Sequence, residues 1–266
     1  MGKIYFIRKL TERNPFSKDG KYSVEWVSIT VNKSRYIMPE TKFVYGCSIG
    51  RKVDFWEYGV MDFINYNLMY NRNVIFVGSK RLYKKALRKY DGHSIYDKEL
   101  RPYEERFIVH STTKGNYEKI VSQGCIKSWN ILKNESDAFE KEPIGAKLGD
   151  PEDFRDYIML GSGVHCEIVV LSKQKKRLCY DVNEEYTPGA RMYFDAKQLA
   201  ENGLMVRDGL HYKVRDRLPL EYVLFTATIN NIFLKDKITP KTFSEEADKE
   251  FFRTCLLYTS PSPRDA

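Results

Sequence analysis

His110, Ser111 and Thr112 are the residues of this chain best suited to chemistry by their type and spacing. They end an apolar, strand-forming stretch that begins at Phe107, and a helical pattern then runs to Gly124. Serine and threonine cap helices, and a helix start presents unpaired backbone amides to an anion. The pattern therefore suits a phosphate-containing ligand. The alternative that the residues leave open is a hydrogen-bonded strand-end histidine without a ligand.

The residues before position 95 alternate strand-like and helix-like patterns, which predicts a small α/β module. Strands are expected over residues 4–7, 26–31, 43–45 and 74–77, and helices over 55–69 and 80–89. Ser79 is the expected cap of the second helix, which has a basic face. The string GSK at 78–80 lacks the spaced glycine and the Gly-Lys-Ser/Thr ending of a phosphate-binding loop. The pattern favours a plain α/β module.

The rest of the chain shows a second, strand-rich pattern. Residues 91–105 are polar and predict a linker with a boundary near residue 100, and residues 134–153 predict a charged loop. Strands are expected over residues 157–160, 165–171, 178–182, 191–194, 204–207, 210–214 and 222–229, with one short helix over 195–202 closed by Gly203. We predict an α+β domain with few helices over residues 104–240.

Composition narrows the classes of protein that the chain can be. With 266 residues and 42% hydrophobic content, it can bury the core of one large or two modest domains. The net charge of +8 and pI near 9.0 favour polyanionic partners such as RNA, DNA or a dinucleotide. No apolar run approaches the roughly 20 residues of a membrane helix, and the start lacks a signal-peptide pattern. We expect a cytoplasmic protein with no membrane partner.

The cysteines and the end of the chain carry separate signals. Cys47, Cys125, Cys166 and Cys179 are far apart and show no metal-ligand spacing, so we expect reduced thiols, no disulfide framework and no metal. Residues 255–266 read CLLYTSPSPRDA and resemble the translation of a transposase sequencing adapter. We expect this tail to be a disordered artefact of an assembled environmental sequence that replaces the natural chain beyond Thr254.

Short motifs of the second domain follow one another in a characteristic order. FDA at 194–196 precedes Gly203, then DGL at 208–210, then LPLEYV at 218–223. The series resembles the closing section of the RNA 2'-phosphotransferases, a branch of the ADP-ribosyltransferase fold, and HST at 110–112 resembles their His-Gly-Thr. The resemblance covers about residues 106–229. It implies an ADP-ribosyltransferase-like split β-sheet domain after the N-terminal α/β module, with NAD as co-substrate.

The resemblance also implies roles for individual residues. In this superfamily the first-strand histidine binds the adenosine ribose of NAD and a nearby hydroxyl residue lies beside the nicotinamide amide, which assigns His110 and Thr112. Ser111 replaces the usual glycine and is still small. A second-strand aromatic or histidine packs near the nicotinamide. Tyr157 is preferred over His165 because it offers a stacking face before a Gly-Ser-Gly turn.

The third position of many transferases is a glutamate, but here it falls near Leu210 or His211. This resembles the phosphotransferase branch, which uses cationic groups against a phosphate, and Arg191 is our first choice for that contact. Other candidates are the arginines Arg207, Arg215 and Arg217 and the carboxylates Glu184, Glu185 and Glu221. The predicted catalytic residues are His110, Tyr157 and Arg191, and the predicted NAD-binding residues also include Ser111, Thr112, His165 and His211.

The chain departs from the phosphotransferases in its first part. Their Leu-Arg-His-x-Pro motif is absent, so residues 1–95 are expected to be a different module of unknown role. The predicted function is NAD-dependent ADP-ribosyl transfer to a nucleic-acid or protein acceptor. The alternatives are RNA 2'-phosphotransferase activity using NAD, NAD hydrolysis without transfer, and a non-catalytic nucleotide or nucleic-acid binding module.

Overall fold

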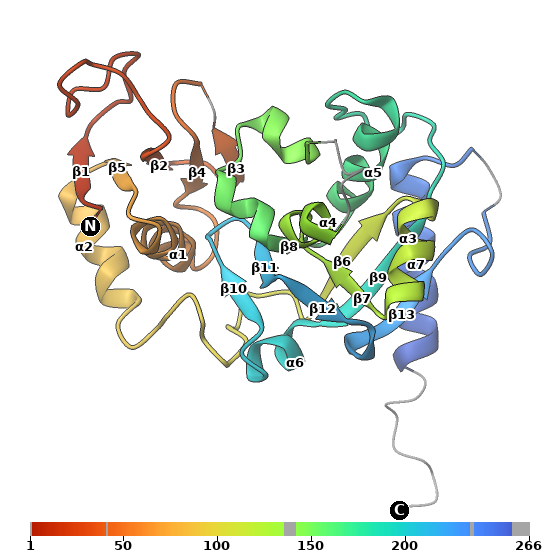
Figure 1. The fold of residues 1–266 in the computed structure, drawn as a ribbon. Helices are drawn as coiled ribbons and strands as arrows, with labels where there is room; N and C mark the ends of the chain where they lie inside the picture. The colour runs from red at the N-terminus through yellow and green to blue at the C-terminus, as the bar shows by residue number, and fades with distance from the viewer. Residues whose placement is uncertain (1, 41, 136–141, 235–236, 257–266) are drawn as a thin grey trace, which may run out of the picture. The chain divides into compact units, whose positions relative to one another are not determined.

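The computed structural model describes residues 2–40, 42–135, 142–234 and 237–256. It is a mixed α+β structure, as predicted, and its residues form two compact units (Figure 1). The first unit contains Met1–Glu104, Gly145–Phe154 and Ala200–Lys213, and the second contains Glu105–Ile144, Arg155–Leu199 and Val214–Ala266. In the part of the chain that the structure describes, no helix is both long and apolar enough to cross a membrane.

The first unit is built on a sheet with strand order β1-β5-β2-β4-β3. Neighbouring strands are parallel except at the edge, where β3 is antiparallel to β4. The strands are β1 (Ile4–Ile7), β2 (Trp26–Asn32), β3 (Ile37–Glu40), β4 (Gly46–Gly50) and β5 (Asn73–Val77). Helix α1 (Trp56–Met69) follows β4, and helix α2 (Lys80–Lys89) follows β5.

Both faces of this sheet are covered by apolar side chains, as is usual for parallel strands. On one face, Val27 and Phe76 pack in the same buried cluster as Trp56 of α1. On the opposite face, Trp26 and Ile75 form a second buried cluster with side chains from the segment that follows β1. The alternation of side chains along β2 and β5 therefore divides the core of this unit in two.

Two later segments of the chain complete the first unit. Residues 145–154 include most of the 3-10 helix η1 (Ile144–Leu148) and the start of η2 (Glu152–Asp156), while residues 200–213 include β10 (Met205–Arg207) and the start of β11 (Tyr212–Arg215). Phe154 makes edge contacts with Tyr45 and Tyr66, with ring centroids 5.8 and 5.9 Å apart. These aromatic contacts join the later segments to the core of the first unit.

The second unit contains an antiparallel sheet with order β13-β9-β6. Its strands are β6 (Phe107–Thr112), β9 (Ala190–Asp195) and β13 (Val223–Ala227). The unit also contains β7 (Cys125–Lys127) paired with β12 (Arg217–Pro219), β8 (Tyr157–Leu160) and the 3-10 helix η3 (Leu220–Tyr222). The register of β6 on β9 places Ser111 opposite Arg191.

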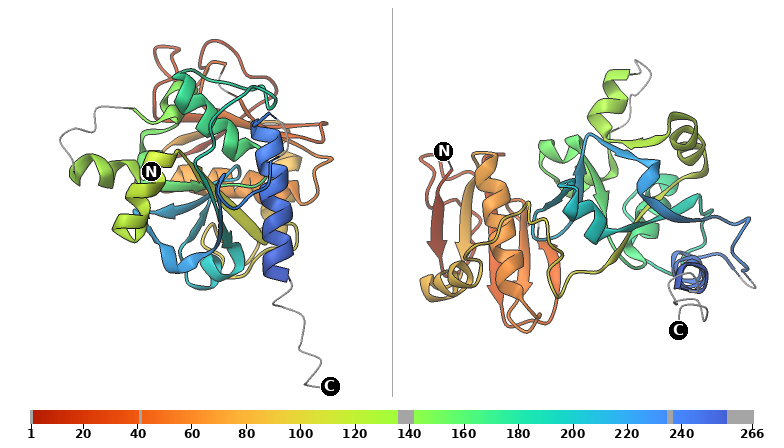
Figure 2. Two further views of the ribbon diagram at one scale, coloured as in Figure 1. Left: turned by 90° about the vertical axis from the view of Figure 1, so that its right-hand side faces the viewer. Right: turned by 90° about the horizontal axis from the view of Figure 1, so that it is seen from below.

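The second unit also contains helices, two of which pack on this sheet. The helices are α3 (Lys114–Gln123), α4 (Trp129–Glu135), α5 (His165–Lys175), α6 (Ala196–Glu201) and α7 (Pro240–Leu256). Helices α5 and α7 share one buried cluster with Val109 of β6 and Tyr193 of β9, and Phe251 stacks on Tyr193 with ring centroids 4.3 Å apart. The left panel of Figure 2 shows α7, in dark blue, as a long helix at the edge of this unit.

Several predicted elements are confirmed. The strands at 4–7 and 157–160 and the helix at 80–89 have the predicted bounds. The Ser79 side chain accepts a bond from the Leu82 amide, 3.3 Å away, as expected for a cap. Gly124 ends α3 with φ 67°, a left-handed conformation that glycine adopts without strain.

Other predictions are wrong. Residues 165–171 form helix α5 instead of a strand, and the helix buries Glu167, Val170 and Leu171 while Val169 is exposed. Residues 178–182 form no strand, and the Cys179 amide donates to the Ser172 hydroxyl at the end of α5. The strand expected at 43–45 lies instead at Gly46–Gly50. The domain expected to contain few helices contains α3 to α7.

Two expected loop or tail regions lie partly outside the described residues. Of the loop expected at 134–153, residues 136–141 are outside them, and the rest includes the end of α4, all of η1 and the start of η2. Of the tail expected to be disordered, Cys255 and Leu256 belong to α7, and residues 257–266 lie outside the described residues.

Candidate functional site

The end of β6 brings several predicted site residues together in the second unit. His110 lies opposite Met192, Ser111 opposite Arg191 and Thr112 opposite Ala190 in the β6–β9 ladder. On the other side of β6, Val109 forms an isolated antiparallel bridge with Gly161, just after β8. His110, Ser111, Thr112 and Arg191 therefore share a short stretch of two neighbouring strands. We call this stretch, with the side chains that contact it, the β6 site.

His110 is held in one protonation state. Its Nδ1 lies 3.1 Å from the carbonyl oxygen of Met159 on β8. Burial, and secondarily the charge of Lys173, lower the pKa of His110 from 6.5 to about 4. The imidazole is therefore neutral at pH 7, and because a carbonyl only accepts, its proton resides on Nδ1. Nε2 is then a hydrogen-bond acceptor, and within the described residues it makes no hydrogen bond.

The Ser111 side chain is held by a carboxylate that was not among the predicted site residues. Its hydroxyl donates a short hydrogen bond to Oε1 of Glu167, and the Tyr186 hydroxyl donates to Oε2 at 2.7 Å. Glu167 is 1% exposed, and burial raises its pKa against the opposing effects of Arg191, Ser111 and Tyr186. The two hydroxyls satisfy both oxygens of the buried carboxylate, so Ser111 is held in one orientation.

Arg191 is also buried and has several partners inside the second unit. Its NH1 lies 3.5 Å from Glu167 Oε1 and donates to the Gly163 carbonyl at 3.1 Å. NH2 donates to Asp248 of α7 at 3.0 Å, and Nε donates to the Tyr193 hydroxyl at 2.9 Å. With 1% of its side chain exposed, Arg191 joins β9 to α5 and α7. These contacts occupy all three nitrogens of the guanidinium, so in this arrangement the side chain positions other groups.

Gly189, just before β9, covers the junction between β6 and α3. A Cβ atom at this position would lie 2.1 Å from the Thr112 carbonyl oxygen and 2.4 Å from the Lys114 amide nitrogen. Both are backbone atoms that cannot move aside without shifting the chain. Only glycine permits this close approach, which fixes the backbone where β6 passes into the first turn of α3.

The remaining predicted site residues have different environments. Thr112 is 2% exposed and Tyr157 is 5% exposed on β8, whereas His165 is exposed at the first position of α5. The sequence analysis expected His165 to lie on a strand, and this expectation is wrong. His211 belongs to the first unit, where its Nδ1 lies 3.2 Å from Asp208 Oδ2.

The surroundings of His211 form a separate buried charged cluster within the first unit. Lys213 is fully buried, lies 2.6 Å from Asp208, and has its Nζ 3.2 Å from the centroid of the Phe154 ring. Burial lowers the pKa of Lys213 to about 8, although Asp208 opposes the change, and burial raises that of Asp150 to about 6. Perturbed ionisable groups of this kind occur at functional sites and in structural ion pairs alike.

Four other charged candidates from the sequence analysis form ion pairs with residues of opposite charge. Arg207 is buried in the first unit, with Nε 2.5 Å from Glu104. Arg217 pairs with Glu135 at 2.5 Å on the surface of the second unit. Glu184 pairs with Arg177 and Glu185 with Lys237. None of these contacts joins the β6 site.

Sequence reasoning missed Glu167, Tyr186 and Asp248. The signal for Glu167 was present, because a helical reading of residues 165–175 places it on the same face as Val170 and Leu171, and an acid on an apolar face requires partners. Tyr186 and Asp248 had no such local signal. They reach Glu167 and Arg191 only through the tertiary fold.

Among the residues that the structure describes, no group of three or more His, Cys, Asp and Glu side chains could hold a metal ion. The cysteines are free, and burial raises the pKa of Cys166 to about 12.

No family model, curated protein or solved structure matches the chain.

Proposed function

We propose that the second unit carries out NAD-dependent ADP-ribosyl transfer to a nucleic-acid or protein acceptor, using the β6 site. The observation that carries the proposal is the state of His110: a neutral imidazole at the end of β6, with Nδ1 held by Met159 and Nε2 free to accept. A ribose hydroxyl is a natural donor to such a nitrogen. The resemblance of residues 106–229 to the RNA 2'-phosphotransferases assigns that same contact to this histidine.

The residues of the β6 site fit the positioning of a dinucleotide. His110 would accept from a hydroxyl of the adenosine ribose, and Thr112, two residues further along β6, would lie near the nicotinamide end. Ser111, Glu167 and Arg191 would fix the backbone and side chains between them without touching NAD. This assigns Arg191 a positioning role in place of the phosphate contact expected from the sequence, because its nitrogens are bonded within the protein.

The chemistry that NAD supplies is an activated glycosidic bond. That bond breaks, nicotinamide leaves with the electron pair, and an acceptor oxygen or nitrogen forms a new bond to the same ribose carbon and gives up a proton. The main contributions required of the protein are to orient NAD and the acceptor and to exclude water from the reacting carbon. His110 is suited to orientation because it stays neutral throughout the physiological pH range.

The test measures NAD binding and nicotinamide release by the full chain, alone and with RNA, DNA or a protein mixture. We expect release with transfer of ADP-ribose to a macromolecule, and a loss of roughly 10- to 100-fold in NAD affinity in His110→Ala, the cost of one hydrogen bond to a buried group. His93→Ala is the matched control, since His93 is an exposed histidine of the first unit. It should bind NAD as the wild type does.

The other outcomes separate the alternatives. Release that requires 2'-phosphorylated RNA would establish phosphotransferase activity in place of ADP-ribosyl transfer. Release without any labelled macromolecule would indicate NAD hydrolysis. If no nicotinamide is released under any condition and His110→Ala binds NAD like the wild type, the proposed use of the β6 site is wrong.

A further inference from the structure

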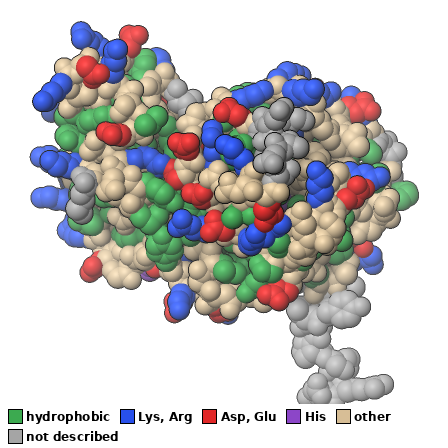
Figure 3. Space-filling view, viewed as in Figure 1, with side chains coloured by type: hydrophobic (Ala, Val, Ile, Leu, Met, Phe, Trp, Pro, Cys, Tyr) green, Lys and Arg blue, Asp and Glu red, His purple; other side chains and the backbone are tan. Residues whose placement is uncertain are grey.

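Helix α2 in the first unit has an unusual distribution of charge. Six of its ten residues, KRLYKKALRK, are lysine or arginine, and none is acidic. Its apolar positions, Leu82, Tyr83 and Ala86, pack into the core beneath it. The basic side chains are therefore confined to the outer face. Figure 3 shows blue side chains gathered at the left margin, where Figure 1 places α2.

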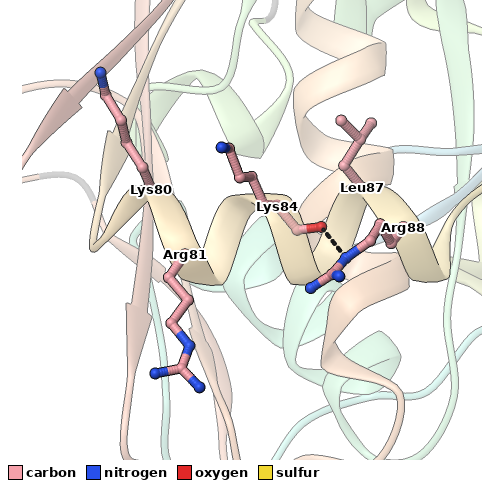
Figure 4. Close-up of a pocket in the computed structure, with 5 residues that line it drawn as sticks. All are labelled: Lys80, Arg81, Lys84, Leu87 and Arg88. Carbon is pink, nitrogen blue, oxygen red and sulfur yellow. Dashed lines mark hydrogen bonds between the residues drawn. The ribbon is translucent and has the colours of Figure 1, made fainter.

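Most of this charge is not neutralised within the protein. Lys85 pairs with Glu57 at 2.6 Å. Within the described residues no carboxylate forms an ion pair with the other five, which are Lys80, Arg81, Lys84, Arg88 and Lys89. The Arg88 Nε donates instead to the Lys84 carbonyl at 3.3 Å (Figure 4). Five exposed cations on one short helix attract a polyanion from solution.

The surface over α2 is hollowed by two shallow, open grooves. One has a volume of about 440 Å³ and is lined by Lys80, Arg81, Lys84, Leu87 and Arg88 (Figure 4). The other has a volume of about 560 Å³ and is lined by Phe6, Ile7, Arg8, Gly78, Ser79 and Lys80. Lys80 belongs to both grooves. Together they follow α2 from the carboxyl ends of β1 and β5 to the last turn of the helix.

The geometry matches a repeating phosphate chain better than a membrane. Lys80, Lys84 and Arg88 are four residues apart, so they line one side of the helix over about 12 Å. Each strand of a DNA duplex carries a phosphate about every 3.4 Å along the helix axis, so this row spans about three phosphates of one strand. A membrane-surface helix needs a broad apolar face turned outward, but on α2 only Leu87 is a large exposed apolar residue.

We propose that the outer face of α2, with Arg8 at the end of β1, binds the phosphate backbone of nucleic acid without sequence preference. We call this set, Arg8, Lys80, Arg81, Lys84 and Arg88, the α2 surface. All five side chains are cations that can bind any phosphate group whatever the base attached to it, so we assign the surface an electrostatic contribution. The proposal is independent of the β6 site, since it concerns only the first unit and requires no NAD.

The test uses the full chain with two fluorescein-labelled probes, a DNA duplex of about 20 base pairs and a single-stranded oligo-dT of the same length, which is longer than a typical single-strand site. Anisotropy is followed between about 50 and 200 mM salt. In Lys80→Gln/Arg81→Gln/Lys84→Gln/Arg88→Gln we expect affinity for both probes to fall at least about tenfold. The slope of log K against log salt should become shallower by about 2 to 4 on the duplex, about 0.9 for each lost phosphate contact. The double variant Lys80→Gln/Lys84→Gln should be intermediate.

The matched control neutralises four exposed cations of the first unit outside α2, in Lys18→Gln/Lys33→Gln/Arg35→Gln/Lys52→Gln. It changes the net charge by the same amount and should keep most of the affinity and the slope. Equal losses in the two quadruple variants would show that only net charge matters and would overturn the proposal. Wild-type binding to phosphatidylserine vesicles with none to either oligonucleotide would also overturn it.

Discussion

An ordinary histidine changes charge close to neutral pH, but His110 does not, because burial lowers its pKa to about 4. The sequence identified His110 as the residue to examine, since it ends a strand and precedes a helix. It could not show which nitrogen would be free, because that depends on the Met159 carbonyl of β8. For Glu167, in contrast, the local sequence did contain a signal, but that signal was ambiguous. Its local pattern is that of a buried helical residue, but the apolar run around it also fits a strand.

The state of His110 predicts a pH dependence of stability. The folded protein keeps the imidazole neutral down to about pH 4, while the unfolded chain protonates it near the ordinary value of 6.5. The unfolded state therefore binds more protons in this window, and the stability contributed by His110 is lost as the pH falls through it. We therefore compare the free energies of unfolding of the wild type and His110→Gln in urea. As the pH falls from 7 to 4, the wild type should lose up to about 3 kcal/mol of stability relative to the variant, which has no group that titrates at this position. A difference that stays constant over this range would contradict the assignment.

Elements whose sequence pattern agrees with their surroundings were predicted with correct bounds, as β1, α2 and β8 show. The errors arise where tertiary contacts decide between two acceptable local patterns. The β-branched run in α5 fits a strand by propensity, but the helix buries Val170 and Leu171 against β6. Similarly, Gly46 and Gly50 suggest a turn, yet they bound a fully buried strand between β2 and β3.

The junction between β6 and α3 offers a prediction with a built-in control. Gly189→Ala would place a methyl group 2.1 Å from the Thr112 carbonyl oxygen, so we expect a loss of about 1 to 3 kcal/mol in the free energy of unfolding. Gly115 directly follows Lys114 in the first turn of α3 and has no atom within 4 Å of an added Cβ, so Gly115→Ala should stabilise the protein by up to about 1 kcal/mol. Chemical denaturation would measure the free energy of unfolding of both variants. The two changes must have opposite signs, and a loss of stability in both variants or in neither would contradict the prediction.

The chain passes from one unit to the other more than once, which local sequence patterns do not reveal. A change of composition near residue 100 indicates the first passage, and the first segment of the first unit ends at Glu104. The return of residues 145–154 and 200–213 to that unit depends on several long-range contacts. One is the ion pair of Arg207 with Glu104, and another is the packing of Phe154 on Tyr66. No residue pattern in those segments announces such contacts.

This arrangement predicts the behaviour of fragments. A fragment of residues 1–104 lacks Arg207, which pairs with Glu104, and Phe154, which packs on Tyr66. It should therefore be less stable than a chain in which Gly-Ser linkers join residues 1–104, 145–154 and 200–213. A loss of even 1 kcal/mol corresponds to about 4 °C in melting temperature for a unit of this size. Circular dichroism melts should show at least that difference. Equal melting temperatures would mean that the later segments do not stabilise the first unit.

The two-faced core of the first unit has a practical consequence for spectroscopy. Two of the three tryptophans, Trp26 and Trp56, are buried in that core on opposite faces of one sheet, and the third, Trp129, begins α4 in the second unit. In a Trp129→Phe variant, all indole fluorescence would come from the first unit. Removing Trp26 or Trp56 in that background would leave a single emitter on a chosen face. Intrinsic emission can thus follow water entering either side of the sheet separately.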